Sequence, residues 1–377
     1  MSDGQEAGAT ATLREIRQQP EVWLEAAAIV ERERAALDAF LAPLLALEDL
    51  RIVLTGAGTS AFAGGVVAPT VARATARRVE SIATTDLVSN PRHYLAEDVP
   101  TLLVSFARSG NSPESVAATR LTDRMLTRTH HLVITCNADG ALAEEHRQRE
   151  DSLVLLMPER ADDVGFAMTS SFTSMMLSAL LAFLGDEAVP VAELARSAAD
   201  LITTGWERIE RLAEERPGRL VYLGSGPLAA LAQESALKSL ELTAGGIVSY
   251  HDSSLGFRHG PKAVLDDDTL VVVYLSNDPY TRSYDLDIVR ELRAAVGADR
   301  VLPVATDDAA PGGIVLPGLA AADDGCLAVA AVVVAQILAV SIALAVGTTP
   351  DDPFPGGAVN RVVQGVRIHA LDEPTGR

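Results

Sequence analysis

Short apolar runs alternate with longer amphipathic stretches along most of the chain. The first half contains four such runs, each bounded by polar or glycine-containing segments: Arg51–Thr55, Thr101–Phe106, Leu132–Thr135 and Leu153–Met157. Helical patterns lie between them. This alternation of buried strands and helices predicts an α/β fold, with a parallel sheet covered by helices on both faces.

The same pattern recurs in the second half of the chain. Its apolar runs are Leu220–Leu223, Thr269–Leu275, Val301–Ala305 and Ile314–Leu316. Two landmarks repeat at one interval of 168 residues: the glycine turns at Gly56 and Gly224, and the strands that begin at Thr101 and Thr269. A single interval for two landmarks predicts a duplicated α/β unit.

These patterns divide the chain into four parts. We expect an N-terminal helical segment at 1–34, a first unit at 35–195, a second unit at 203–346 and a Pro/Gly-rich tail at 347–377. The helical pattern covers Leu13–Leu47, with a helix beginning near Pro20 because proline favours a first helical turn. The linker between the units is expected within Gly185–Thr203.

One apolar segment, Cys326–Val346, is long enough to span a bilayer. Its flanks are acidic, with Asp323 and Asp324 before it, and neither end carries a Lys, Arg, Trp or Tyr anchor. We therefore expect a helix that is buried on all sides, in a domain core or a subunit interface.

Composition and charge narrow the function classes. The 377 residues are 48% hydrophobic and 4% aromatic, which suits packed helices and parallel strands. A net charge of −20 without a basic stripe argues against nucleic-acid binding, and an acidic membrane surface would repel the chain. Cys136 and Cys326 form neither a disulfide framework nor a zinc spacing, which fits a reducing cytoplasm.

The segment Thr55–Ser60 (TGAGTS) leads from a strand through two glycines into a helix. Backbone N–H groups and the hydroxyls of Thr59 and Ser60 suit an anion there. A tight turn with Ser60 as an ordinary N-cap is the alternative. A dinucleotide-binding motif formed by Gly56, Gly58, Ala61 and Glu80 is a less favoured alternative, because the next loop does not fit that motif.

That next loop is Ser105–Ser115 (SFARSGNSPES). Ser109, Asn111, Ser112 and Ser115 cluster around Gly110, and the guanidinium of Arg108 can add a forked pair of donors. This combination predicts a phosphate-binding cradle that needs no net positive charge, and a capped surface loop is the alternative. Both loops follow strands of one parallel sheet, so they meet at the edge where ligands bind.

Two further segments carry titratable groups. Glu234, Lys238 and Glu241 have a spacing that places all three on one helix face, which is either catalytic or a solvated salt-bridged face. His259 lies in the polar loop Tyr250–Lys262 and is either an acid–base group or a surface histidine in a turn. The remaining histidines form no metal-ligand set.

Four of these motifs, G-A-G-T-S, F-A-R-S-G-N-S-P-E-S, E-S-A-L-K-S-L-E-L-T and G-F-R-H-G-P, resemble the tandem sugar isomerase (SIS) domains of ketose/aldose phosphosugar isomerases. The segments T-T-D-L-V-S-N-P, F-A-M-T-S-S, D-P-Y-T-R-S-Y-D-L-D and V-N-R-V-V-Q-G-V are similar to the AgaS type. The resemblance covers about Glu15 to His369. It implies two SIS domains of flavodoxin-like, three-layer architecture.

The resemblance also assigns roles by position. The family's phosphate loop falls on Arg108, Ser109, Asn111 and Ser112, with Thr59 and Ser60 at the first turn; Asn111 replaces the usual Glu and Ala107 a Ser. It implies that Glu241 is the base, that Lys238 stabilises negative charge, and that His259 assists ring opening. Residues with less defined roles are Glu234, Arg258, Asn360 and Arg361, and the tail lacks the lysine of glucosamine-6-phosphate synthase.

The function implied is deamination of D-galactosamine 6-phosphate to D-tagatose 6-phosphate and ammonia, by proton transfer from C2 to C1. Alternatives are a plain ketose/aldose isomerase, a fructosamine-phosphate deglycase and a non-catalytic sugar-phosphate sensor. No metal or cofactor is expected. The expected partners are an amino-sugar phosphate and further copies of the chain in a homodimer or higher homo-oligomer, with neither nucleic acid nor membrane.

Overall fold

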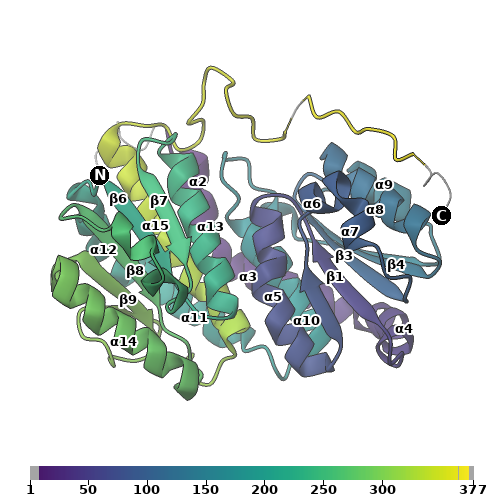
Figure 1. The fold of residues 1–377 in the computed structure, drawn as a ribbon, viewed down its shortest axis with the longest axis horizontal. Helices are drawn as coiled ribbons and strands as arrows, with labels where there is room; N and C mark the ends of the chain where they lie inside the picture. Colours follow the sequence, from purple (N-terminus) through teal and green to yellow (C-terminus); the bar gives the residue numbers. More distant parts are fainter. Residues whose placement is uncertain (1–7, 364, 373–377) are drawn as a thin grey trace.

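The computed structural model describes residues 8–363 and 365–372, and two five-stranded parallel sheets lie side by side in it (Figure 1). The first sheet is formed by β1 (Arg51–Thr55), β2 (Arg78–Ser81), β3 (Thr101–Ala107), β4 (Thr129–Thr135) and β5 (Ser152–Leu156). The second is formed by β6 (Arg219–Leu223), β7 (Val248–Asp252), β8 (Thr269–Tyr274), β9 (Val301–Ala305) and β10 (Ile314–Val315). The ends of the expected N-terminal segment and tail, at 1–7 and 373–377, and Gln364 lie outside the described residues.

The two sheets have the same topology, which confirms the predicted duplication. Their orders are β2-β1-β3-β4-β5 and β7-β6-β8-β9-β10, and all the pairings are parallel. In the first sheet Arg51 pairs with Thr101, and in the second Arg219 pairs with Thr269. The interval of 168 residues between the two halves is therefore kept in the strand register.

Helices cover both sheets. The helices that precede the first sheet, lie between its strands or directly follow it are α2 (Thr10–Arg17), α3 (Gln19–Arg32), α4 (Arg34–Leu45), α5 (Thr59–Thr75), α6 (Thr84–Ser89), α7 (Pro91–Tyr94), α8 (Pro113–Met125), α9 (Ala141–His146) and α10 (Ser170–Leu184). Those that follow are α11 (Val191–Asp200), α12 (Trp206–Glu214), α13 (Pro227–Leu242), α14 (Pro279–Val296) and α15 (Asp324–Val346).

The halves meet where α5 packs against α13. These two helices follow the equivalent strands β1 and β6 of the duplicated unit. A Cβ atom on Gly65 of α5 would lie 2.8 Å from the Cβ of Ala230 on α13, so glycine is needed for this close approach. The contact brings the carboxyl edge of the first sheet next to residues of the second unit.

Helix α15 is the predicted apolar helix, and it is buried among α10, α11, α12 and α13. It is long and apolar enough to cross a membrane, but most of it lies inside the protein, as a core helix would. Its polar residue Gln336 accepts a hydrogen bond from Gln19 Nε2 at 2.7 Å. This bond satisfies the amide oxygen of Gln336, whereas its buried Nε2 has no hydrogen-bond partner among the described residues.

Three elements differ from expectation. Helix α2 precedes the helix expected near Pro20, which is α3. The expected linker is largely helical, as α11 followed by a π-helical turn at Leu201–Gly205. The edge strands β2 and β7 were not predicted, because both are short and polar, and β7 takes in the start of the expected loop at Tyr250.

Candidate active site

A cavity of about 230 Å³ lies at the carboxyl edge of the first sheet. The chain leaves β1 and β3 there toward opposite faces, and this is the switch point at which parallel α/β sheets bind ligands. Residues from both halves and from the tail line the cavity: Ala57, Gly58, Thr59, Ser60, Phe106, Ala107, Arg108, Ser109, Ser112, Ser115, Phe166, Met168, Lys238, Glu241, Val359, Asn360, Arg361, Val362 and Val363.

The turn after β1 forms the first wall. Gly58 has φ +56°, a left-handed conformation that favours glycine, and it is the N-cap of α5 without a side-chain cap. A Cβ on Gly56 would lie 2.6 Å from Ser60, so only glycine fits the turn. The start of α5 therefore places Thr59 and Ser60, with their hydroxyls, in the lining of the cavity.

The loop after β3 supplies the second wall. Ser112 is the N-cap of α8, but its side chain makes no capping hydrogen bond, which leaves its hydroxyl and the helix N-terminus for a ligand. Arg108 is only 7% exposed, and its Nη1 has no hydrogen-bond partner among the described residues. Burial, and next the nearby Arg361, lower the pKa of this guanidinium. A buried, unpaired cation at a cavity wall is suited to an anionic group.

Helix α13 of the second unit brings the titratable groups. The Lys238 ammonium is buried and lies 2.6 Å from Glu241 Oε2, 3.0 Å from Thr59 Oγ1 and 3.4 Å from Glu234 Oε1. Burial opposes the charge of Lys238, but the two carboxylates outweigh it and raise its pKa. Burial raises the pKa of Glu234 to about 7, against the lowering effect of Lys238.

The two carboxylates of α13 differ in burial and in access to the cavity. The Glu234 side chain is fully buried behind Lys238 and does not line the cavity, whereas that of Glu241 is 24% exposed and does. Glu241 is therefore the carboxylate that can reach a bound molecule. The predicted helix face is thus a buried charge network and not a solvated one.

Two segments without regular secondary structure line the remaining side of the cavity. Loop 162–168 contributes Phe166 and Met168, and tail 351–363 contributes Asn360 and Arg361 with the three valines beside them. We call them the roof segments. Ser115, expected in the cluster around Gly110, lines the cavity. The sequence does not predict that Phe166 and Met168 line it, although F-A-M-T-S-S stands out, because their approach depends on contacts far apart in the chain.

Besides Glu234, three of the expected site residues lie outside the cavity lining of this chain. Asn111 points away from the cavity, and its Oδ1 accepts a hydrogen bond from Ala141 N at the start of α9 (2.9 Å). Arg258 forms an ion pair with Glu291 (2.8 Å). His259 is exposed and is not among the residues that line the cavity.

The structure also bears on the cofactor alternatives. Glu80, the candidate ribose ligand of a dinucleotide fingerprint, accepts a hydrogen bond from Arg51 Nε at 2.6 Å, so it serves as an ion-pair partner. Within residues 8–363 and 365–372 there is no group of three or more His, Cys, Asp or Glu side chains that could hold a metal ion.

In the second sheet, a carboxylate of the protein itself occupies the equivalent place. Asp285 of α14 is fully buried and accepts hydrogen bonds from Ser225 Oγ (2.7 Å), Ser254 Oγ (2.6 Å) and Ser276 N (3.0 Å). Ser225 and Ser276 correspond, at the interval of 168, to the cavity-lining positions of Ala57 and Arg108. The N-cap Asp278 also accepts a hydrogen bond from Thr281 N. These donors of the second edge are therefore already paired within the protein.

Comparisons with known proteins agree with this architecture. The SIS domain family matches residues 44–185. The AgaS protein of Streptomyces coelicolor is 57% identical over 373 residues, and the D-galactosamine-6-phosphate deaminase AgaS of Escherichia coli is 46% identical over 370; each alignment covers 96% of both chains. The crystal structure of tagatose-6-phosphate ketose/aldose isomerase from Escherichia coli superposes with a TM-score of 0.87 and 44% identity, and the match covers 97% of this chain and 99% of that one. The chain therefore belongs to the AgaS family of SIS-domain proteins.

Proposed function

We propose that this enzyme is an amino-sugar-6-phosphate deaminase that converts D-galactosamine 6-phosphate and water to D-tagatose 6-phosphate and ammonia. One observation carries the proposal: an anion cradle and a Lys–Glu pair line the same cavity. The names of the Escherichia coli and Shewanella relatives, which are 46% and 42% identical, give the substrate.

The phosphate would lie in the cradle formed by the loop after β3 and the start of α5. Arg108 offers its unpaired Nη1, and Ser60, Ser109 and Ser112 offer hydroxyls. Charge-assisted hydrogen bonds of this kind are stronger than neutral ones. Thr59 serves Lys238 as an acceptor, so it links the cradle to the reacting end.

The reacting end would lie against Glu241 and Lys238. After ring opening, Glu241 removes the proton from C2, and the electron pair of the C2–H bond forms the C1–C2 double bond of an enaminol while O1 takes up a proton from water. Lys238, held as an ammonium by its two carboxylates, stabilises negative charge that develops on O1. Glu241 returns the proton to C1, which leaves an imine at C2. Water adds to this imine, and the C2–N bond breaks to give the ketone and ammonia.

The roles of His259 and of the oligomer remain linked proposals. His259 would move protons during ring opening, but in one chain it lies outside the cavity, so this role requires a neighbouring copy to bring it there. Exposed apolar side chains at Leu240, Val248 and Leu255 lie in the same part of the second unit and support a homo-oligomer. Arg258 would act with His259. A cytoplasmic setting is proposed with them, supported by two cysteines that are both free.

The decisive experiment follows ammonia release by the purified enzyme over a panel of 6-phosphorylated amino sugars. We expect D-galactosamine 6-phosphate to be turned over and the Glu241→Gln variant to be nearly inactive. Light scattering gives the oligomeric state, and mixing Glu241→Gln with His259→Asn chains tests shared sites: recovered activity would show that His259 acts on a neighbouring cavity. Binding of sugar phosphates without turnover would instead support a sensor.

The name of the Escherichia coli structure favours a second candidate, a ketose/aldose isomerase acting on tagatose 6-phosphate. The same C2-to-C1 proton transfer would serve it, with a hydroxyl in place of the amine. Incubation with D-tagatose 6-phosphate, followed by NMR detection of the aldose, distinguishes the two. A higher kcat/KM on the neutral sugar than on the amino sugar would make isomerisation the principal reaction.

A further inference from the structure

The roof segments have no regular secondary structure of their own in the described chain. Loop 162–168 and tail 351–363 touch each other through the rings of Phe166 and Phe354, whose centroids are 5.3 Å apart. They also touch through Arg361, which lies 3.9 Å from Asp162 and whose carbonyl accepts a hydrogen bond from Arg108 Nη2. Their position over the cavity therefore depends on where they are anchored.

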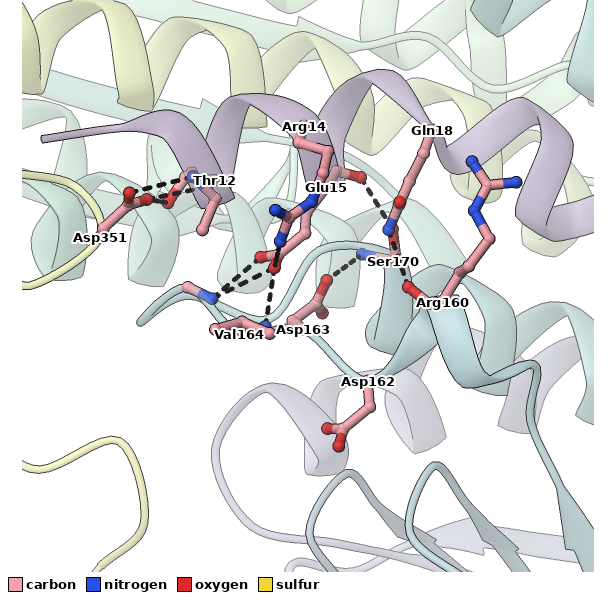
Figure 2. Close-up of polar contacts among 12 residues, drawn as sticks. Thr12, Arg14, Glu15, Gln18, Arg160, Asp162, Asp163, Val164, Ser170 and Asp351 are labelled. Atoms are coloured by element: carbon pink, nitrogen blue, oxygen red, sulfur yellow. Dashed lines mark hydrogen bonds and ion pairs between the residues drawn. The ribbon is translucent and has the colours of Figure 1, made fainter. Parts of the chain in front are cut away.

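Both roof segments are anchored on α2, which precedes the duplicated units (Figure 2). At the start of the tail, the Asp351 carboxylate accepts hydrogen bonds from Ala11 N (3.0 Å), Thr12 N (2.8 Å) and Thr12 Oγ1 (2.8 Å). The N-cap of α2 is Ala9, which has no side-chain acceptor. Asp351 therefore caps α2 from about 340 residues away in the sequence, and this fixes the tail to the helix.

The loop is held one turn further along α2 by Glu15. Its carboxylate is almost fully buried and accepts hydrogen bonds from Val164 N (2.7 Å) and Gly165 N (3.1 Å). A Cβ on Gly165 would lie 2.9 Å from Glu15 Oε2 and from Thr12 Oγ1, so the loop backbone rests directly on the helix. The side chain of Val164 is left 64% exposed, so hydrogen bonds and not apolar burial hold this part of the loop. The buried carboxylate of Asp163 adds to them, since it accepts hydrogen bonds from the backbone N–H groups of Thr169, Ser170 and Ser171 at the start of α10.

Gln18 completes the same face of the helix. Its Nε2 donates to Arg160 O (2.8 Å), before the loop, and to Ser170 Oγ (3.1 Å), after it. Ser170 Oγ in turn donates to Glu15 O (2.7 Å). Thr12, Glu15 and Gln18 follow one another at intervals of three residues, so they share one side of α2.

We propose that this side of α2 positions the roof of the active site, with Glu15 as its central positioning residue for substrate binding. Glu15 does not line the cavity, so it acts through Val164 and Gly165 on Phe166 and Met168. Thr12 acts in parallel through Asp351 on the tail that carries Arg361. A short helix outside both sheets is thereby part of the binding machinery. The kinetic consequence rests on the proposed function, but the placement of the roof does not.

The test compares Glu15→Ala, which removes both acceptor oxygens, with Glu15→Gln, which keeps one. Glu31→Ala, at an exposed position of α3, is the matched control. We expect Glu15→Ala to raise KM for D-galactosamine 6-phosphate about tenfold or more and to change kcat much less, because Glu241 and Lys238 stay in place. Glu15→Gln should bring KM back to within about threefold of the wild type.

Hydrogen–deuterium exchange provides a readout that needs no activity. In Glu15→Ala, exchange should accelerate at residues 162–168 and 354–363 and stay unchanged in the strands of both sheets. A role limited to overall stability would instead lower Tm without this local pattern and without a rise in KM well below Tm. If Glu15→Ala does not fold, Thr12→Val replaces it, because this change removes one hydrogen-bond donor to Asp351. KM and the exchange of residues 354–363 are then measured in that variant.

The experiments distinguish failure of this proposal from failure of the proposed function. Unchanged KM and unchanged exchange of both roof segments in a folded Glu15→Ala protein would overturn the proposal. A wild type that deaminates no amino-sugar phosphate would overturn the proposed function alone, since the exchange experiment then still decides whether Glu15 holds the roof.

Discussion

At the scale of single residues, two glutamates on one helix have different environments. Glu241 reaches the cavity and contacts Lys238 at 2.6 Å, while Glu234 is enclosed behind the lysine. Replacing Glu241 with Gln keeps the shape and removes the basic oxygen, so kcat should fall by about 10²–10⁴-fold with little change in KM. Loss of deuterium label from C2 of the substrate, followed by NMR, checks the step. If the Glu241→Gln variant turned over at a near wild-type rate, another group would be the base, and Glu234 would be the next candidate to test.

The loop after β3 offers a matched pair of substitutions. Ser109 lines the cavity, whereas the Asn111 side chain caps α9. Ser109→Ala would remove the proposed hydrogen bond to the phosphate. Hydrogen bonds to charged groups are worth about 1.5–3 kcal/mol, so KM should rise roughly 10- to 150-fold. Asn111→Ala should lower stability and leave KM nearly unchanged. Steady-state kinetics and thermal melting separate the two effects, and a large rise in KM for Asn111→Ala would return Asn111 to the binding site.

Glu15 should make stability depend on pH near neutrality. Burial, and next Asp163, raise its pKa to about 7, while the N–H groups of Val164 and Gly165 and the charge of Arg14 pull it down. Glu159, Arg160 and Asp162 line the surface beside it. Because the folded-state pKa lies above the ordinary value of 4.5, the stabilisation is complete below about pH 4.5 and is lost as pH rises through 7.

Glu15→Gln cannot titrate, so it isolates this contribution. Between pH 5 and pH 8, the free energy of unfolding of the wild type should fall relative to that of Glu15→Gln. Urea titrations at several pH values measure the difference. A constant difference across this range would show that Glu15 does not change its protonation there.

At the scale of elements, the duplication provides two equivalent helices with different N-termini. In α8 the N-cap Ser112 makes no capping hydrogen bond, whereas in α14 the N-cap Asp278 accepts one from Thr281 N. We expect Ser112→Ala to raise KM at little cost in stability without ligand. Asp278→Ala should lower stability and leave KM unchanged. Thermal melting with and without substrate tests this, and the opposite assignment would mean that α8 is not the phosphate-binding helix.

The sequence predicts elements best where local physics alone determines them. The continuous apolar strands β1, β3, β6 and β8 were predicted because strands buried on both faces need such runs. The edge strands β2 and β7 were not, because pairing with a neighbour and not composition makes them strands. The helix face of Lys238 and Glu241 followed from spacing, but the direction of Asn111 and the approach of Phe166 depend on contacts that spacing does not reveal.

At the scale of the whole molecule, the part of the chain that the structure describes has two equivalent sheet edges, and Asp285 fills the second one. Removing Asp285 would leave the hydroxyls of Ser225 and Ser254 and the N–H of Ser276 without their buried acceptor. Asp285→Ala should therefore cost about 3 kcal/mol or more in the free energy of unfolding. Asp287→Ala, an exposed change on the same helix, is the control and should cost little. Equal urea midpoints for the two variants would contradict this assignment of Asp285.

The carboxylate of Asp285 has a consequence for the ligand-free protein. The second half supplies an acceptor carboxylate from the side chain of Asp285, so the groups that donate to it are already paired without any ligand. In the proposed reaction, the first half would bind and release a phosphate in every catalytic cycle. Of the two equivalent edges, the second would keep its carboxylate throughout, and only the occupancy of the first would change with substrate.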